Sequence, residues 1–125
     1  MNVIIPVDLK PLPTQNEYSV AEILANYFHA DVYFVPRNNY KTPDFKINGR
    51  FWELKSPVGK GKYNLQHALR NASKQSENII LDARLSKIHM TRIINELKRQ
   101  YKISRGIKRL LVIDKHGSVI DISEC

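Results

Sequence analysis

The sequence has little of several features that mark common classes of small protein. Cysteine occurs once, at Cys125, so the chain can form no internal disulfide and no thiolate metal site. No apolar run approaches the roughly 20 residues that a membrane span requires. The first residues lack the basic start and long apolar stretch of a secretory signal. We therefore expect neither a disulfide partner nor a membrane partner.

Familiar nucleic-acid-binding patterns and repeats are missing as well. The sequence has no internal repeat and no helix-turn-helix, zinc-finger or RNA-recognition signature. Its four histidines are scattered without the spacing of metal ligands: His29, His67, His89 and His116. The length of 125 residues and the 42% hydrophobic content suit one compact domain with an ordinary core.

What the chain has in excess is positive charge. Lysine and arginine number 20 against 12 aspartate and glutamate residues, which gives a formal net charge of +8. An excess of this size in a small domain favours a polyanionic partner such as nucleic acid. The charge alone also fits simple solubility or an acidic protein partner.

Helical and strand-like patterns alternate along the chain. The first 13 residues, with three prolines, are expected to be extended, and Thr14 and Glu17 have the spacing of a capping box. Helices are expected from about residue 16 to 28, over 64–76 and over 86–101, and strands over 31–35, 44–47, 50–56, 78–82, 109–114 and 119–122. This alternation predicts one α/β domain over residues 1–125, with helices covering a mixed β-sheet.

A β-hairpin in the middle of the chain carries the most informative pattern. Asn48 and Gly49 form a strong two-residue turn signal between two strand-like runs. A turn at these residues places Asp44 directly opposite Glu53, and alternation along the strand puts Lys55 on the same face. The opposite face is apolar and should enter the core: Phe45, Ile47, Trp52 and Leu54.

Two opposed carboxylates destabilise a sheet unless a positive charge compensates them. Directly opposite residues have Cβ atoms about 5 Å apart. Mg²⁺ prefers oxygen ligands and is usually held by one or two carboxylates, so Asp44 and Glu53 are candidate metal ligands. Lys55 would project beside them, where it can hold a water molecule or stabilise charge on a phosphate. The simpler alternative is a hairpin with one polar, solvated face.

The same residues resemble a known motif. Pro43 and Asp44, followed after eight residues by Glu53, Leu54 and Lys55, resemble the signature of the PD-(D/E)xK nuclease superfamily. The resemblance covers roughly residues 15–82. It implies a restriction-endonuclease-like mixed β-sheet flanked by helices, and metal-dependent hydrolysis of phosphodiester bonds in nucleic acid.

Members of that superfamily usually carry a glutamate on a helix before the signature. Glu17 matches this place, because Glu17, Ala21 and Leu24 resemble the spacing of the family. The alternative role of Glu17 is purely structural, as the carboxylate of the capping box. Glu22 is the substitute candidate if Glu17 serves only as the cap.

A narrower resemblance concerns residues 43–57, the helical segment that follows them and the short strand ending in Asp82. These segments resemble the C-terminal toxin domains of CdiA-type contact-dependent growth inhibition proteins. Related domains are tRNA nucleases. The resemblance implies delivery into the cytoplasm of a target cell, action on tRNA there, and a cognate immunity protein as a partner.

The resemblance and the residues together define a candidate site. Glu17, Asp44, Glu53 and Lys55 are the expected catalytic residues, and the three carboxylates are the expected ligands of Mg²⁺ or Mn²⁺, with Zn²⁺ a weaker candidate. Nucleic acid is expected to contact the glycine-rich basic loop and the helix after it, through Lys60, Lys62, Arg70, Lys74 and Gln75. Arg70 and Lys74 also fit an ordinary solvated helix face. Tyr18, Tyr40 and Tyr63 would stack on bases if they border the cleft.

The sequence is also compatible with other functions. The same metal chemistry would serve a DNA endonuclease, either restriction-like or a junction resolvase. A protein of a different class, a catalytically inactive nucleic-acid-binding module, would bind without metal and without the acidic pair. A structural domain whose basic surface meets an acidic protein is a third alternative.

Overall fold

The chain alternates strands and helices as its sequence patterns predict. The computed structural model describes residues 2–37 and 42–124. The described elements are, in order, β1 (Val3–Ile4), α1 (Gln15–Phe28), β2 (Val32–Phe34), β3 (Phe45–Ile47), β4 (Arg50–Lys55), α2 (Asn64–Ser73), β5 (Asn78–Asp82), α3 (Met90–Ile103), β6 (Arg109–Ile113), β7 (Val119–Asp121) and the 3₁₀ turn η1 (Ile122–Glu124). The predicted α/β class is confirmed.

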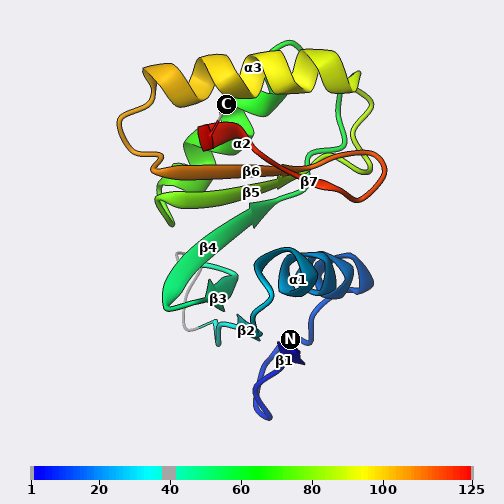
Figure 1. Ribbon diagram of the computed structural model, residues 1–125, viewed down its shortest axis with the longest axis vertical. Coiled ribbons are helices and arrows are strands. Elements are labelled where there is room, and N and C mark those ends of the chain that lie inside the picture. The colour runs from blue at the N-terminus through cyan, green and yellow to red at the C-terminus, as the bar shows by residue number, and fades with distance from the viewer. Residues whose placement is uncertain (1, 38–41, 125) are drawn as a thin grey trace.

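One mixed sheet runs through the whole molecule. Its seven strands lie in sequence order from β1 to β7. The pairs β1–β2, β4–β5 and β5–β6 are parallel, and the other three pairs are antiparallel. Strand β4 spans the two halves of the sheet, with α2 and α3 over one half and α1 beside the other (Figure 1).

The helices bury opposite faces of this sheet. Alternate residues of the strands pack with α1 in one apolar cluster, which includes Phe45, Ile47 and Trp52. The residues between them on β5 and β6, such as Ile79 and Leu81, pack with α2 and α3 in a second cluster. Because β5 and β6 are covered on both sides, their polar residues lie at the strand ends and the residues between them are apolar.

The first helix begins at the capping box that the sequence predicts. Thr14 is the N-cap, and its hydroxyl accepts a hydrogen bond from the backbone N–H of Glu17 at 3.1 Å. The Glu17 carboxylate accepts one from the backbone N–H of Thr14 at 2.9 Å. These bonds satisfy two donors that the start of a helix would otherwise leave unpaired.

The central hairpin has the predicted turn and register. Asn48 and Gly49 both adopt positive φ angles, 51° and 79°, as a tight two-residue hairpin turn requires. Ile47 pairs with Arg50, and the pairing continues along the strands to Phe45 and Trp52. The predicted apolar face is confirmed, since its residues are buried or pack against the α1 cluster.

Apart from shifts of one or two residues at element ends, the main differences from the sequence-based prediction concern three elements. Residues 3–4 form the extra strand β1, whose parallel pairing with β2 is too distant in sequence to leave a local signal. The last helix begins at Met90 rather than near Ser86, because the Ser86 hydroxyl accepts a hydrogen bond from the backbone N–H of Ile88 and stabilises a turn there. Helix α2 ends at Ser73, so Gln75 lies beyond the helix on which it was expected.

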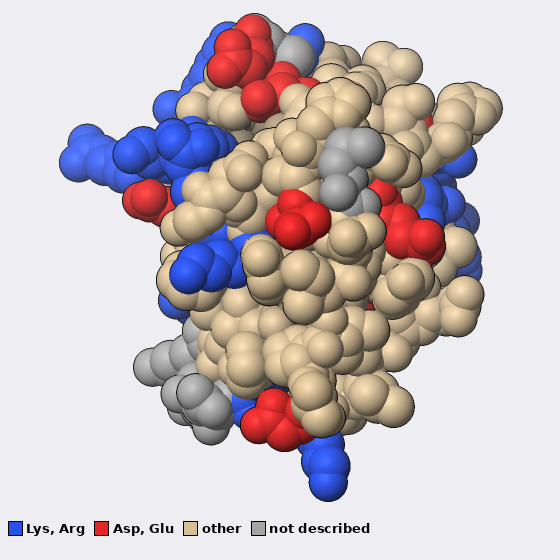
Figure 2. Space-filling model, turned by 60° about the horizontal axis from the view of Figure 1, so that its bottom comes forward, with Lys and Arg blue, Asp and Glu red and all other residues tan. Residues whose placement is uncertain are grey.

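Basic side chains lie mainly toward the edges of one face of the molecule. Figure 2 shows lysine and arginine at the left and right edges of this face, while its middle is mostly uncharged apart from a few acidic side chains. None of the helices in the described part of the chain is both long and apolar enough to cross a membrane.

Candidate metal and nucleic-acid site

The hairpin brings Asp44 and Glu53 together. Asp44 directly precedes β3, and its backbone N–H donates to the carbonyl of Trp52 at 3.0 Å. One oxygen of the Asp44 carboxylate, Oδ2, accepts a hydrogen bond from the backbone N–H of Leu54 at 2.8 Å. These two bonds flank Glu53 on the opposite strand and hold Asp44 beside it.

Glu53 is a buried acid with an incomplete set of partners. The residue is only 4% exposed, on the face of β4 that α2 covers. Its Oε1 atom is buried and has no hydrogen-bond partner among the described residues. Burial, and after it the negative charge of Asp44, raise the pKa of Glu53 to about 8, while Lys55 acts in the opposite direction. A hairpin face that is simply solvated is therefore not what the structure contains.

Lys55 lies beside the acidic pair, as alternation along β4 predicts. Its Nζ atom is 3.5 Å from Oε2 of Glu53, and its side chain is 28% exposed. The ammonium group of Lys55, which solvent can partly reach, therefore lies beside Glu53 in the acidic pair.

The donor set suits a small divalent cation. Two carboxylates in contact, one with a buried oxygen that lacks a partner, can be compensated by a proton or by a metal ion. Asp44 and Glu53 provide the one or two carboxylates that Mg²⁺ usually takes from a protein. Within residues 2–37 and 42–124, no group of three acidic, histidine or cysteine side chains is close enough to hold a metal. A metal here would depend on two carboxylates, with its remaining positions filled by other oxygen ligands.

Glu17 reaches this pair only through an arginine. Its Oε2 atom accepts a hydrogen bond from Nη2 of Arg37 at 2.7 Å, and the same nitrogen lies 3.4 Å from Oδ1 of Asp44. Glu17 thus combines its capping role with a position one side chain away from the acidic pair. Glu22, the substitute candidate, is exposed and lines a different hollow, which it shares with Tyr18.

A second polar cluster, not predicted from the sequence, lies where β5 ends. The Arg84 guanidinium donates two hydrogen bonds of 2.9 Å to the carboxylate of Asp82, whose side chain is 1% exposed. Its Nη2 atom also donates to Asn16 Oδ1 at 3.1 Å and to Ser19 Oγ at 2.9 Å, both on α1. The loop after β5 is therefore tied to the first turns of α1.

This cluster extends to the residue that follows Lys55. The amide Nδ2 of Asn16 lies 3.3 Å from the Ser56 hydroxyl and donates to it. Asn16 precedes Glu17, and Ser56 follows Lys55, so the cluster holds the neighbours of two predicted site residues. Nothing in the local sequence distinguishes Arg84 from the other basic residues, because its partners on α1 lie more than 60 positions away.

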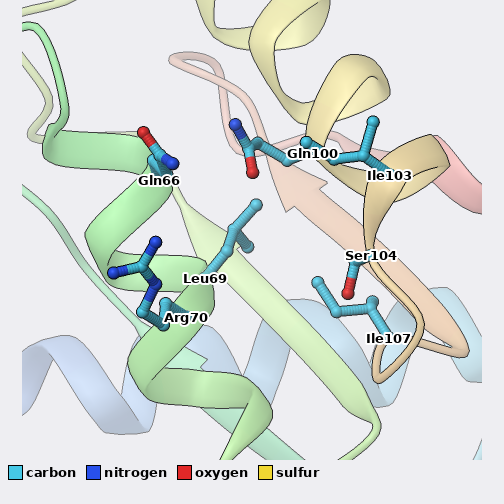
Figure 3. A pocket seen from close by; sticks show the side chains of 7 residues that line it. All are labelled: Gln66, Leu69, Arg70, Gln100, Ile103, Ser104 and Ile107. Atoms are coloured by element: carbon cyan, nitrogen blue, oxygen red, sulfur yellow. The ribbon is translucent and has the colours of Figure 1, made fainter.

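The predicted nucleic-acid contacts fall in three places. Lys60 and Lys62 are exposed on the loop between β4 and α2, and Lys74 is exposed at the end of α2. Arg70 lines a hollow of about 240 Å³ between α2 and α3 (Figure 3). That hollow is not bordered by Asp44, Glu53 or Lys55. Gln75 lines a different hollow, of about 370 Å³, together with Phe51.

The two tyrosine stacking candidates that the structure describes lie in different places. Tyr18 lies on α1 beside β1, and Tyr63 is 54% exposed at the start of α2. Lys62 Nζ is 5.5 Å from the centre of the Tyr63 ring. Tyr40 lies outside the described residues.

The architecture is shared with a chain of known structure. The protein is similar to a solved chain described as "CdiA-CT/CdiI toxin and immunity complex from Burkholderia pseudomallei", with a TM-score of 0.64. The two are 23% identical, and the match covers 97% of this chain and 98% of the other. A likeness at this identity establishes a common fold.

The sequence itself identifies the family. Residues 41–119 match the family model of the contact-dependent growth inhibition CdiA C-terminal domain. Because this match spans more than half of the chain, the protein belongs to that family and is a contact-dependent growth inhibition toxin domain. The matched region contains Asp44, Glu53 and Lys55, whereas Glu17 lies before it. No curated protein sequence matches the chain.

Proposed function

We propose that this toxin domain is a metal-dependent nuclease of the PD-(D/E)xK type that hydrolyses phosphodiester bonds in tRNA. The observation that carries the proposal is the buried Oε1 of Glu53, which has no hydrogen-bond partner among the described residues while its carboxyl group lies beside Asp44 and Lys55. Burying a carboxyl oxygen without a hydrogen-bond partner costs about 1–3 kcal/mol even when the group is neutral, and acids perturbed in this way cluster at functional sites.

The acidic pair would hold the Mg²⁺ or Mn²⁺ ion. Such an ion lowers the pKa of a bound water and neutralises charge on a phosphate. Asp44 is ready to bind because its Oδ2 is already oriented by the N–H of Leu54. Glu53 must first lose a proton that its raised pKa retains.

Lys55 would act on the reacting phosphate. Its ammonium group lies 3.5 Å from Glu53 and is 28% exposed, so it reaches both the acidic pair and the solvent. In this position it can orient the attacking water or stabilise the negative charge that develops on the phosphate. Arg37 lies on the other side of Asp44 and links it to Glu17.

The charge and the family support the proposed substrate and setting. The net charge of +8 favours a polyanion, and the exposed Lys60 and Lys62 follow the strand that carries Lys55. The similar Burkholderia pseudomallei chain was solved as a toxin with its immunity protein, which supports a cognate immunity protein for this domain. Action on tRNA would take place in the cytoplasm of the target cell.

Incubation with total tRNA and with plasmid DNA, each with Mg²⁺ and with EDTA, tests this function. We expect Mg²⁺-dependent cutting of tRNA, absent in Asp44→Asn, which keeps the size of the side chain. Cutting of plasmid alone would make the protein a DNA endonuclease. Binding of either nucleic acid in EDTA, with no cutting under any condition, would support an inactive binding module instead.

A further inference from the structure

A row of exposed side chains crosses the sheet beside the candidate site. Tyr33 on β2 pairs in register with Lys46 on β3, and Lys46 pairs with Phe51 on β4. All three lie on the face opposite α1, because the residues that alternate with them and face α1 are buried in its cluster: Val32, Phe34, Phe45, Ile47 and Trp52. Tyr33 and Phe51 are each 45% exposed, and Lys46 is exposed as well.

The row combines two aromatic rings with positive charge. Lys46 Nζ lies 5.5 Å from the centre of the Phe51 ring, within the range of a cation–π interaction. A hollow of about 380 Å³ is lined by Tyr33, Lys46 and the hairpin turn. The hollow of about 370 Å³ that Gln75 lines is also lined by Phe51 and by the turn residue Gly49. The rings therefore border two adjoining depressions.

The Phe51 backbone is held firmly. Its carbonyl oxygen accepts hydrogen bonds from the Ser76 hydroxyl at 2.8 Å and from Asn78 Nδ2 at 3.0 Å. These bonds anchor the start of β4 to the segment between α2 and β5. The exposed Phe51 ring thus stands on a rigid backbone.

The row leads directly to the acidic pair. Phe51, Glu53 and Lys55 alternate along β4 and so share one face of the strand. Two residues along a strand span about 7 Å. If one base of a nucleic-acid strand stacks on Phe51, the next nucleotides of that strand are therefore within reach of Glu53 and Lys55.

We propose that Tyr33, Lys46 and Phe51 form a stacking surface for unpaired bases of the nucleic acid that the proposed nuclease cuts. Aromatic rings stack on the flat faces of bases, which a double helix covers and a single-stranded loop exposes. Lys46 and the neighbouring exposed Arg50 complement the phosphates of such a loop. The surface selects single-stranded segments, and it rests on the proposed function for the identity of its ligand.

Binding in EDTA tests the surface without requiring cutting. The probes are a fluorescently labelled 12-nucleotide RNA without secondary structure and an RNA duplex of the same length, measured by fluorescence anisotropy. Leucine in place of Tyr33 and Phe51 preserves apolar surface but removes the rings. We expect the double variant Tyr33→Leu, Phe51→Leu to bind the single strand at least about fivefold more weakly, and the duplex within about twofold of the unmodified protein.

Three further variants serve as controls. Phe51→Tyr keeps a ring and should bind the single strand as the unmodified protein does, which separates stacking from a structural role even if the double variant is unstable. Tyr18→Leu, at a similarly exposed tyrosine on α1, should have no effect. Lys46→Gln should weaken single-strand binding more than Lys102→Gln, at an exposed lysine on α3.

Several results would overturn the stacking surface. They are unchanged binding in the folded double leucine variant, equal loss on single strand and duplex, or loss in Phe51→Tyr equal to loss in the double leucine variant. The nuclease proposal fails separately. If binding depends on the rings but no metal-dependent cutting occurs, the stacking surface is supported and the nuclease proposal is wrong. If cutting occurs but binding does not depend on the rings, the nuclease proposal is supported and the stacking surface is wrong.

Discussion

The guanidinium of Arg84 holds the buried carboxylate of Asp82 through two hydrogen bonds of 2.9 Å each. Bidentate pairs of this kind are among the stronger polar interactions in proteins and have a defined geometry. Here the pair also reaches α1, so it connects the end of β5 to the helix that carries Glu17. The two halves of the molecule therefore meet at a polar contact close to the candidate site.

Replacing Arg84 should destabilise the protein strongly. Arg84→Ala leaves the carboxylate of Asp82 buried without its partner, and breaking a buried ion pair in this way costs about 3–5 kcal/mol. Urea unfolding followed by the fluorescence of the single tryptophan, Trp52, measures the change. Arg99→Ala is the matched control, because the Arg99 side chain is 61% exposed and its pair with Glu96 should contribute less than about 1 kcal/mol. Similar losses in both variants would show that the Asp82–Arg84 pair is not structurally important.

The contribution of Glu53 to the stability of the metal-free protein should fall as the pH rises. The pKa of Glu53 is raised in the folded state, so between about pH 4.5 and 8 the folded protein holds a proton that the unfolded chain has lost. Folding is favoured at the acidic end of this range, and one such group changes stability by at most about 1.4 kcal/mol per pH unit. In thermal unfolding with EDTA, the unfolding temperature of Glu53→Gln should therefore rise relative to that of the unmodified protein as the pH approaches 8. Parallel curves for the two proteins would contradict the raised pKa.

Removing Arg37 should strengthen metal binding. Its guanidinium lies 3.4 Å from Asp44 and repels a cation at the acidic pair, but its side chain is 40% exposed and solvent screens the effect. We expect Arg37→Gln to raise the affinity for Mn²⁺ about twofold to fivefold by isothermal titration calorimetry at pH 8. Arg50→Gln, at an exposed arginine of the hairpin, should change the affinity less. Weaker binding in Arg37→Gln would mean that Arg37 instead supports the metal ligands.

Lys55 should matter for rate far more than for metal binding. Removing one preorganised charge from the reacting phosphate typically slows catalysis by about 10²–10³-fold. Lys55→Ala should therefore cut tRNA at least about 100-fold more slowly, while its Mn²⁺ affinity stays within a few fold. Loss of folding in this variant, detected by circular dichroism, would assign Lys55 a structural role.

The central hairpin could be predicted because its determinants are local. Asn48 and Gly49 adopt positive φ angles, and this turn sets the register that brings Asp44 and Glu53 together. The capping box at Thr14 was predictable for the same reason, since both of its partners lie within one helical turn.

The remaining parts of the site depend on contacts between distant segments. The burial of Glu53 requires α2 to cover its face of β4, and hairpin alternation alone does not show this. The Arg84 cluster joins α1 to the loop after β5, and the stacking surface needs β2 beside β3. Only the assembled sheet brings these residues into place.

Single-turnover cleavage of tRNA in Mg²⁺ tests the central claim, that the acidic pair of the hairpin performs metal-dependent hydrolysis. The variants are Asp44→Asn and Glu53→Gln, which keep the shape of each side chain, with Glu22→Gln as the control at an exposed carboxylate of α1. We predict at least about a 100-fold loss of rate in each of the first two, with folding retained, and no loss in the third. Rates within about twofold of the unmodified protein for folded Asp44→Asn and Glu53→Gln would contradict the account.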